Sequence, residues 1–176
     1  RLARELIDLK KKYPARVFLL MGNRDINKMR LSAELSDEAM MKGPEAAFEA
    51  WWDPNAPTLM KYLTTKGLED SKVNRLKWIL RHTMGSPNAF EHRRHELILL
   101  NGASASVVSD DEVLGSFLQS VEPGGMLASY LQHAQIGVIL GDTLFVHGAV
   151  EERSLGFIPS PLTRYKLNSR EELLKL

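Results

Sequence analysis

The stretch Val17-Phe18-Leu19-Leu20-Met21-Gly22-Asn23-Arg24-Asp25 decides the fold prediction, because a short apolar run ends in a glycine that three polar residues follow. A continuous apolar run of this length is typical of a strand covered on both faces. Gly22 is expected to let the backbone turn sharply after the strand. Since ligands of α/β proteins bind at the carboxyl ends of strands, Asn23 and Asp25 are the first candidates for a functional site. A simple Gly-Asn turn is the alternative interpretation.

A second pattern, further along the chain, also places polar residues at a strand end. The apolar segments 136–140 and 143–146 flank a Gly-Asp dipeptide. Two such segments around a Gly-Asp turn predict a β-hairpin. The second strand is followed by His147 and a glycine. Two strands are therefore expected to end in side chains that can bind a metal ion or a phosphate group.

The composition is that of a globular protein, with 44% hydrophobic and 26% charged residues among 176. A formal net charge of +1 provides no electrostatic basis for binding nucleic acid. The absence of cysteine excludes disulfides and cysteine-bound zinc. No apolar run approaches the roughly 20 residues that span a bilayer, and no signal-peptide pattern is present. We expect a cytoplasmic protein.

Helical patterns with little strand signal fill residues 26–133. Their limits are predicted by capping residues, prolines and glycines. The expected helices lie at 37–41, from Pro44 through Phe48, Trp51 and Trp52, at 58–66, 72–84, 88–100, 109–121 and 125–133. The buried stripe of the 72–84 helix is predicted to be Val73, Leu76, Ile79, Leu80 and Met84. Core packing is the expected role of Trp51 and Trp52, and stacking on a nucleoside is the alternative.

A first helix is predicted over residues 1–12 and a last one from Ser169. The first has an apolar face formed by Leu2, Leu6 and Leu9, with Ile7 beside it. Ser169 begins a capping-box-like arrangement, which is typical of a helix start.

Basic side chains are concentrated on two successive helices, at Arg75, Lys77, Arg81, His82, His92, Arg93, Arg94 and His95. Because arginine binds phosphate through paired hydrogen bonds, Arg81, Arg93 and Arg94 are candidates for holding the non-reacting phosphates of a substrate. Two solvated helix faces are the alternative. His92 and His95 lie three residues apart and could bind a metal ion, but we interpret them as a surface pair because no matching partner helix stands out.

Two of these motifs resemble those of the calcineurin-like metallophosphoesterases, which include phosphoprotein phosphatases and diadenosine tetraphosphatases. Gly22-Asn23-Arg24-Asp25 resembles their Gly-Asn-His-Asp/Glu motif, and Val146-His147-Gly148 resembles their later strand-His-Gly motif. The resemblance covers residues 1–31 and 134–160. It implies an α/β fold that is part of a calcineurin-like α/β/β/α sandwich. Residues 1–31 and 134–176 would form a partial core, and residues 32–133 a large helical insert or lid.

The resemblance also implies a chemistry. The family hydrolyses phosphate esters by attack of metal-activated water, using two divalent ions such as Mn, Fe or Zn. By resemblance, Asn23 and His147 are ligands of the same ion, and Asp25 matches an acidic catalytic position. The substrate would be a phosphorylated small molecule, a nucleotide or a phosphoprotein.

Arg24 departs from the motif, because the family has a histidine at this position. Arginine stays protonated and is a poor general acid, but it can stabilise negative charge on the substrate. Arg24 is therefore a candidate for both catalysis and substrate binding. The structural alternative is that Arg24 pairs with Asp25 or another carboxylate and faces away from the site.

The family's Asp-x-His, Gly-Asp-x-x-Asp and last histidine motifs have no counterpart in the 176 residues. We therefore expect the chain to be a fragment of a longer parent protein, with neither metal ion fully bound and the isolated chain inactive. A catalytically dead scaffold or regulatory binding domain of the same fold is the alternative function.

Overall fold

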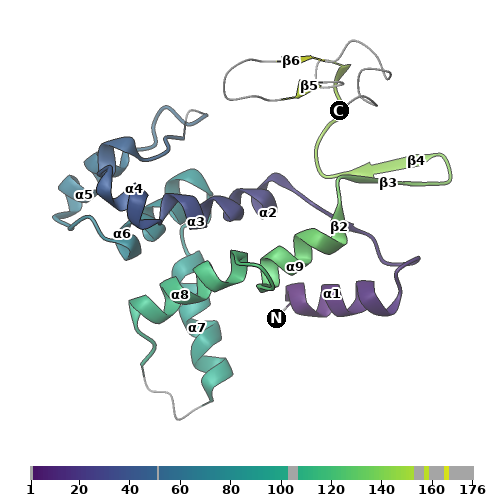
Figure 1. The fold of residues 1–176 in the computed structure, drawn as a ribbon, viewed down its shortest axis with the longest axis horizontal. Helices are drawn as coiled ribbons and strands as arrows, with labels where there is room; N and C mark the ends of the chain where they lie inside the picture. Colours follow the sequence, from purple (N-terminus) through teal and green to yellow (C-terminus); the bar gives the residue numbers. More distant parts are fainter. Residues whose placement is uncertain (1, 51, 103–106, 153–156, 159–164, 167–176) are drawn as a thin grey trace.

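The computed structural model describes residues 2–50, 52–102, 107–152, 157–158 and 165–166, the last two pairs by their backbone alone. Its fold combines many helices with small sheets (Figure 1). The first helix, α1 (Leu2–Lys12), confirms the prediction for this segment. The predicted apolar face of α1 is wrong, because Ile7 is buried whereas Leu2 and Leu9 are exposed. This helix lies alongside α9 (Met126–His133), whose limits also match the prediction.

The helices that follow the first strand begin at Asn23. They are α2 (Asn23–Asn27), the 3-10 turn η1 (Lys28–Arg30), α3 (Leu31–Glu34) and α4 (Asp37–Met41), then the turn η2 (Pro44–Ala46). The others are α5 (Leu59–Lys66), α6 (Lys72–Trp78), the π-helical η3 (Ile79–Thr83), α7 (Ala89–Asn101) and α8 (Asp110–Val121). Most of these limits follow the capping signals. The side chains of Ser36, Thr58, Ser71 and Ser109 each accept a backbone N–H of the first turn.

The helix expected from Pro44 through Trp52 is wrong. Only the short turn η2 forms, and Ala47 is already extended. A helix confined between Pro44 and the next proline is too short to be stable without tight packing. Trp52 is 46% exposed and lies beside Phe48, so it is not the core residue that was expected, and Trp51 lies outside the described residues. The tryptophan in the core is Trp78, whose indole N–H donates to the carbonyl of Pro57 at 3.0 Å.

The main hydrophobic cluster lies within the helices between residues 31 and 127. Its most deeply buried side chains are Leu31, Leu35, Leu59, Leu76, Trp78, Leu80 and Val113. The stripe predicted for the 72–84 helix belongs to this cluster, with Val73 partly buried at its edge. Arg75 is also buried, and its guanidinium donates two hydrogen bonds of 2.7 Å to the carboxylate of Asp70. The residues expected to form an insert thus contain the core of the described structure.

The described residues form three two-stranded sheets. The strand β1 (Leu19–Leu20) pairs in parallel with β2 (Ala134–Gln135). The strands β3 (Gly137–Leu140) and β4 (Thr143–Val146) form the predicted antiparallel hairpin, and β5 (Phe157–Ile158) pairs with β6 (Tyr165–Lys166). β1 is shorter than the expected strand, although Leu19 is buried. The helix predicted from Ser169 lies outside the described residues.

Candidate functional site

The strand register brings the two motifs together. β1 runs parallel to β2, and Leu20 is level with Gln135. The chain then continues through Ile136 into β3, turns, and returns along β4, whose last residue Val146 pairs with Gly137 at the start of β3. His147 therefore follows β4 at the level where β1 ends. This arrangement places His147 beside Gly22 and Asn23. In Figure 1, β4 returns to the start of β3, next to β2.

Asn23 and His147 are in direct contact, although they are 124 residues apart in sequence. His147 Nε2 lies 3.1 Å from Asn23 Oδ1, so the imidazole N–H can donate to the amide oxygen. Both residues are exposed. A ligand approaching from solvent can therefore reach Nε2 of His147 and Oδ1 of Asn23.

Gly22 makes this contact possible through its lack of a side chain. A Cβ atom on Gly22 would lie 2.8 Å from His147 Cε1 and Nδ1. The expected reason for this glycine is wrong, because its backbone is extended, with φ −106° and ψ 167°, which any residue can adopt. The glycine is needed because the imidazole ring packs directly against the backbone.

Asn23 does not lie in a loop, because it is the first residue of α2. Asp25 accepts a 2.9 Å hydrogen bond from the Gly22 N–H, which caps this helix. The negative charge suits the helix N-terminus. The hydroxyl of Tyr130 donates to the Leu20 carbonyl at 3.3 Å, and burial, followed by the charge of Asp25, raises the pKa of this phenol. Through its hydrogen bond to the Gly22 N–H, Asp25 thus holds the turn that carries Asn23.

Arg24 turns toward the helices instead of toward a carboxylate. Its guanidinium donates a hydrogen bond to the carbonyl of Met84, just beyond the end of η3. The alternative prediction is that Arg24 pairs with Asp25, but the contact that forms is the one with Met84. Gly85 lies against the same guanidinium, since a Cβ there would be 2.5 Å from Arg24 Nη1. No sequence signal marks this contact, although a glycine after a helical pattern does indicate a helix end.

Two of the other three phosphate-binding candidates, Arg93 and Arg94, make hydrogen bonds that hold helices together. Arg93 donates to Glu96 at 2.5 Å and to the Ser116 hydroxyl at 3.0 Å. Arg94 donates to Glu91 at 2.9 Å, and also to the Val108 carbonyl and the Asp110 carboxylate. The hydrogen bonds to Ser116 and Asp110 join α7 to α8. Arg81 is exposed on η3.

Among the described residues, no group of three or more histidines, aspartates and glutamates is placed to hold a metal ion. His92 and His95 are exposed on α7. His133 Nδ1 lies 2.8 Å from the Ser129 carbonyl within α9. Burial, followed by the nearby charges of Arg81 and Lys66, lowers the pKa of His82.

The Asn23–His147 pair nevertheless has the geometry of two adjacent metal ligands. Donor atoms at about 2.1 Å from an ion with octahedral geometry are about 3.0 Å apart when they occupy neighbouring positions. The observed separation of 3.1 Å fits this arrangement. A side-chain amide oxygen and a neutral imidazole nitrogen are also donors that suit Mn²⁺, Fe²⁺ or Zn²⁺. The pair can supply two ligands of one ion, and the ion would need further ligands from elsewhere.

Two cavities lie elsewhere in the described structure. One, of about 600 Å³, has largely apolar walls that include Phe48, Leu59 and Trp78. The second, of about 680 Å³, is more polar and lies between α1, α7, α8 and α9. Neither includes Asn23 or His147 in its lining. Asn23 and His147 are both exposed.

Within the part of the chain that is described, no helix has both the length and the apolar character required to cross a membrane. No protein-family model matches the chain. Searches among curated proteins and among solved structures likewise find no significant match.

Proposed function

We propose that this chain carries part of the active centre of a calcineurin-like metallophosphoesterase, an enzyme that hydrolyses phosphate esters. Asn23 and His147 bind one of two divalent metal ions, which are Mn, Fe or Zn. Ligands beyond Asn23 and His147 are needed to complete the two metal sites and the activity. The observation that carries the proposal is the 3.1 Å contact between two side chains that, by resemblance to the family, are ligands of the same ion.

The proposed fold is part of an α/β/β/α sandwich with residues 32–133 as an insert. The exposed apolar surface of the hairpin region supports it, since soluble monomers rarely leave such patches uncovered. The exposed side chains are Ile136, Ile139, Leu140, Leu144, Phe145 and Val150. An isolated hairpin is at best marginally stable in water, and further strands or a second layer would stabilise it.

The residues of the chain have separate roles in this proposal. A divalent ion held by Asn23 and His147 would activate water for attack and stabilise negative charge on the phosphoryl oxygens. Asn23 offers its amide oxygen and His147 its Nε2 lone pair, so the imidazole proton must move to Nδ1. Asp25 holds the helix start that presents Asn23. The open surface around the pair leaves space for a phosphorylated small molecule, a nucleotide or a phosphoprotein.

A regulatory or scaffold domain that has lost catalysis is the second candidate. Two observations favour it. Arg24 replaces the family's proton-donating histidine and donates to Met84. Among the described residues, no three or more histidines, aspartates and glutamates are grouped so that they could hold a metal ion. Such a domain would bind partners without hydrolysing phosphate esters.

Metal binding and hydrolysis by the intact parent protein test the proposal. Mn²⁺ affinity is measured by electron paramagnetic resonance, and hydrolysis with p-nitrophenyl phosphate, a dinucleoside polyphosphate and a phosphoserine peptide. Asn23→Ala and His147→Ala should each weaken Mn²⁺ binding by at least about 10-fold, since each removes a ligand. Asn27→Ala, on the same helix, should leave the affinity unchanged.

The two candidate functions give different results. Mn²⁺-dependent turnover of any of the three substrates supports the enzyme. Undetectable turnover together with undetectable Mn²⁺ binding by the wild type refutes the enzyme and supports the scaffold.

A further inference from the structure

Arg24, the residue that departs from the family's Gly-Asn-His-Asp/Glu motif, connects the candidate site to the helices. Arg24 is the second residue of α2, directly after Asn23. It donates to the carbonyl of Met84, which lies 60 residues away in sequence. Carbonyl groups at helix ends lack intrahelical partners and carry partial negative charge, so a guanidinium is well suited to this position.

Gly85 shapes the place that receives the Arg24 guanidinium. Its φ of +60° lies in the left-handed region, which favours glycine. A Cβ at this position would also lie 2.5 Å from Nη1 and 3.2 Å from Nη2 of Arg24. Any other residue at position 85 would strain the backbone and displace the guanidinium.

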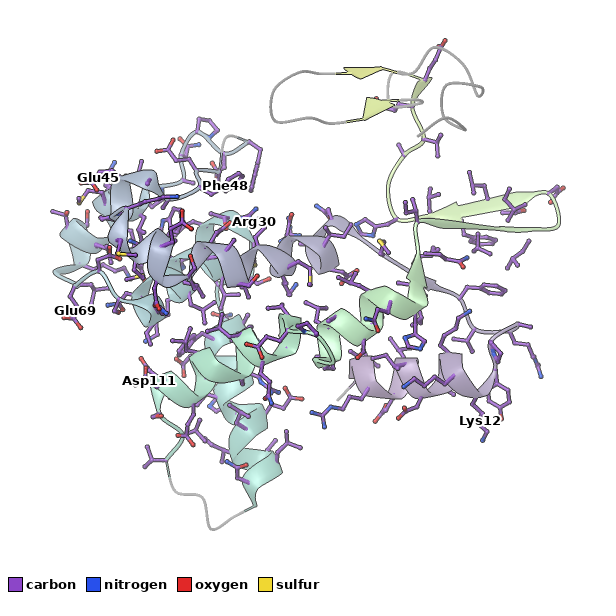
Figure 2. The ribbon with its side chains drawn as sticks, viewed as in Figure 1. Lys12, Arg30, Glu45, Phe48, Glu69 and Asp111 are labelled. Carbon is purple, nitrogen blue, oxygen red and sulfur yellow. The ribbon has the colours of Figure 1, made fainter. Side chains whose placement is uncertain are left out.

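Arg30 makes a second connection to the same segment. Its Nη2 donates to the Thr83 hydroxyl at 3.2 Å, next to the carbonyl that Arg24 uses. Figure 2 labels Arg30, whose guanidinium also lies over the ring of Phe48 at 4.1 Å. Two arginines, Arg24 in α2 and Arg30 at the end of η1, thus hold consecutive residues at the end of η3.

The receiving segment is buried in the core. Thr83 and Met84 are each 3% exposed, and Met84 belongs to the main hydrophobic cluster together with Leu31 and Leu35. The first turn of α2 lies at the surface, and α2 has no buried residue of its own. The position of Asn23 therefore depends on the contacts of its helix, and the hydrogen bond from Arg24 to the Met84 carbonyl is one of them.

We propose that Arg24 is a positioning residue, which uses the end of η3 to set the position of Asn23 relative to His147. In this role Arg24 neither donates a proton nor contacts the substrate. The helices between the two motifs control metal binding through one hydrogen bond. The inference rests on the proposed function for its consequence, but the contact geometry can be measured without metal.

The test compares two ways of breaking the contact with two matched controls in the intact protein. Arg24→Ala removes the donor, and Gly85→Ala displaces it. Gly67→Ala is the control for backbone strain, because Gly67 has φ +62° at the end of α5 and no atom within 4 Å of its Cβ position. Arg16→Ala is the control for loss of an exposed arginine before β1.

The first readout is the nuclear Overhauser contact between the Asn23 side-chain amide and the His147 ring in metal-free protein. It should weaken in Arg24→Ala and Gly85→Ala and stay unchanged in both controls. The second readout is Mn²⁺ affinity, which should fall by about 10-fold in the same two variants, as for other residues that orient metal ligands. The double variant should bind Mn²⁺ no more weakly than either single variant, because both changes act through one contact.

A catalytic role would give a different pattern. If Arg24→Ala lowers kcat while leaving Mn²⁺ affinity and the Asn23–His147 contact unchanged, the positioning role is wrong. The same holds if Gly67→Ala weakens the contact as much as Gly85→Ala, because the effect is then general strain. If the wild type binds no Mn²⁺, the proposed function fails, and the metal-free contact measurement alone decides whether Arg24 positions Asn23.

Discussion

Gly22 leaves the space that the His147 ring fills, and this single position decides whether the two candidate ligands can meet. The ring atoms lie 2.8 to 2.9 Å from where a Cβ would stand. Real Cβ atoms do not approach other atoms so closely, so either the ring or the backbone must move when a side chain is added. The contact between Asn23 and His147 therefore depends on the lack of a side chain at position 22.

Gly22→Ala should accordingly separate Asn23 from His147 without introducing backbone strain. We expect Mn²⁺ affinity to fall by about 10-fold or more, since the imidazole would leave its ligand position. Gly148→Ala is the control, because no atom lies within 4 Å of its Cβ position. Titration with Mn²⁺ measures both variants. Equal affinities for the wild type and Gly22→Ala would show that the ring does not need this position.

The start of α8 is the main junction between elements in the described structure. Ser109 and Glu112 form a capping box at its N-terminus. Asp110 accepts hydrogen bonds from Lys77 of α6, at 2.5 Å, and from Arg94 of α7. The hydrogen bond from Lys77, followed by that from Arg94, lowers the pKa of the Asp110 carboxyl. One carboxylate thus joins three helices.

Asp110→Asn should destabilise the protein in a pH-dependent way. The lowered pKa of the folded state means that Asp110 contributes stability above its unfolded pKa of about 3.9, and this contribution is lost as the pH falls through the folded pKa. Near pH 7 the loss should be about 1 kcal/mol, because the carboxylate is partly exposed and screened by solvent. Urea unfolding of both proteins across this pH range measures the difference.

Asp111→Asn is the matched control for Asp110→Asn. Asp111 also lies in the first turn of α8, where Figure 2 labels it, and no ion pair joins it to another helix in the described structure. Asp111→Asn should lower the free energy of unfolding at pH 7 by less than Asp110→Asn does. A destabilisation by Asp110→Asn that is the same at pH 7 and at pH 3 would contradict the assigned cause.

At the scale of the whole molecule, burial is concentrated in the helices between the two motifs. α4, α5 and α6 lie at one end of the molecule and the β3–β4 hairpin at the other, as Figure 1 shows. The cluster of buried residues belongs to the helical end. The hairpin retains exposed apolar side chains, including Ile139 and Phe145. The helices should therefore account for most of the cooperative stability.

Leu76→Ala should destabilise the fold by about 2–5 kcal/mol, because it creates a cavity in a closely packed core. Leu76 is 0% exposed. Leu9→Ala on α1 is the control, since Leu9 is 45% exposed and its loss should change stability by less than about 1 kcal/mol. The free energy of unfolding in urea compares the two. Similar effects of both substitutions would mean that the core is not where the described structure places it.

The sequence by itself determined the elements whose causes are local. Ser36, Thr58 and Ser109 mark helix starts because a capping hydrogen bond reaches only two or three residues along the chain. The Gly-Asp turn of the β3–β4 hairpin is equally local, with Gly141 at φ +64°. The motifs also identified Asn23 and His147 as a pair before any geometry was known.

Only the tertiary structure decided which partner each side chain finds. It placed Asn23 against His147, turned Arg24 toward Met84 instead of Asp25, and buried Ile7 in place of Leu2 and Leu9. Periodicity along one helix cannot reveal which face another helix will cover. The contact between Arg24 and Met84 joins residues 60 positions apart, and such contacts depend on the packing of the intervening helices. Local sequence patterns carry no information about that packing, which is why the contact between Arg24 and Met84 could be seen only in the structure.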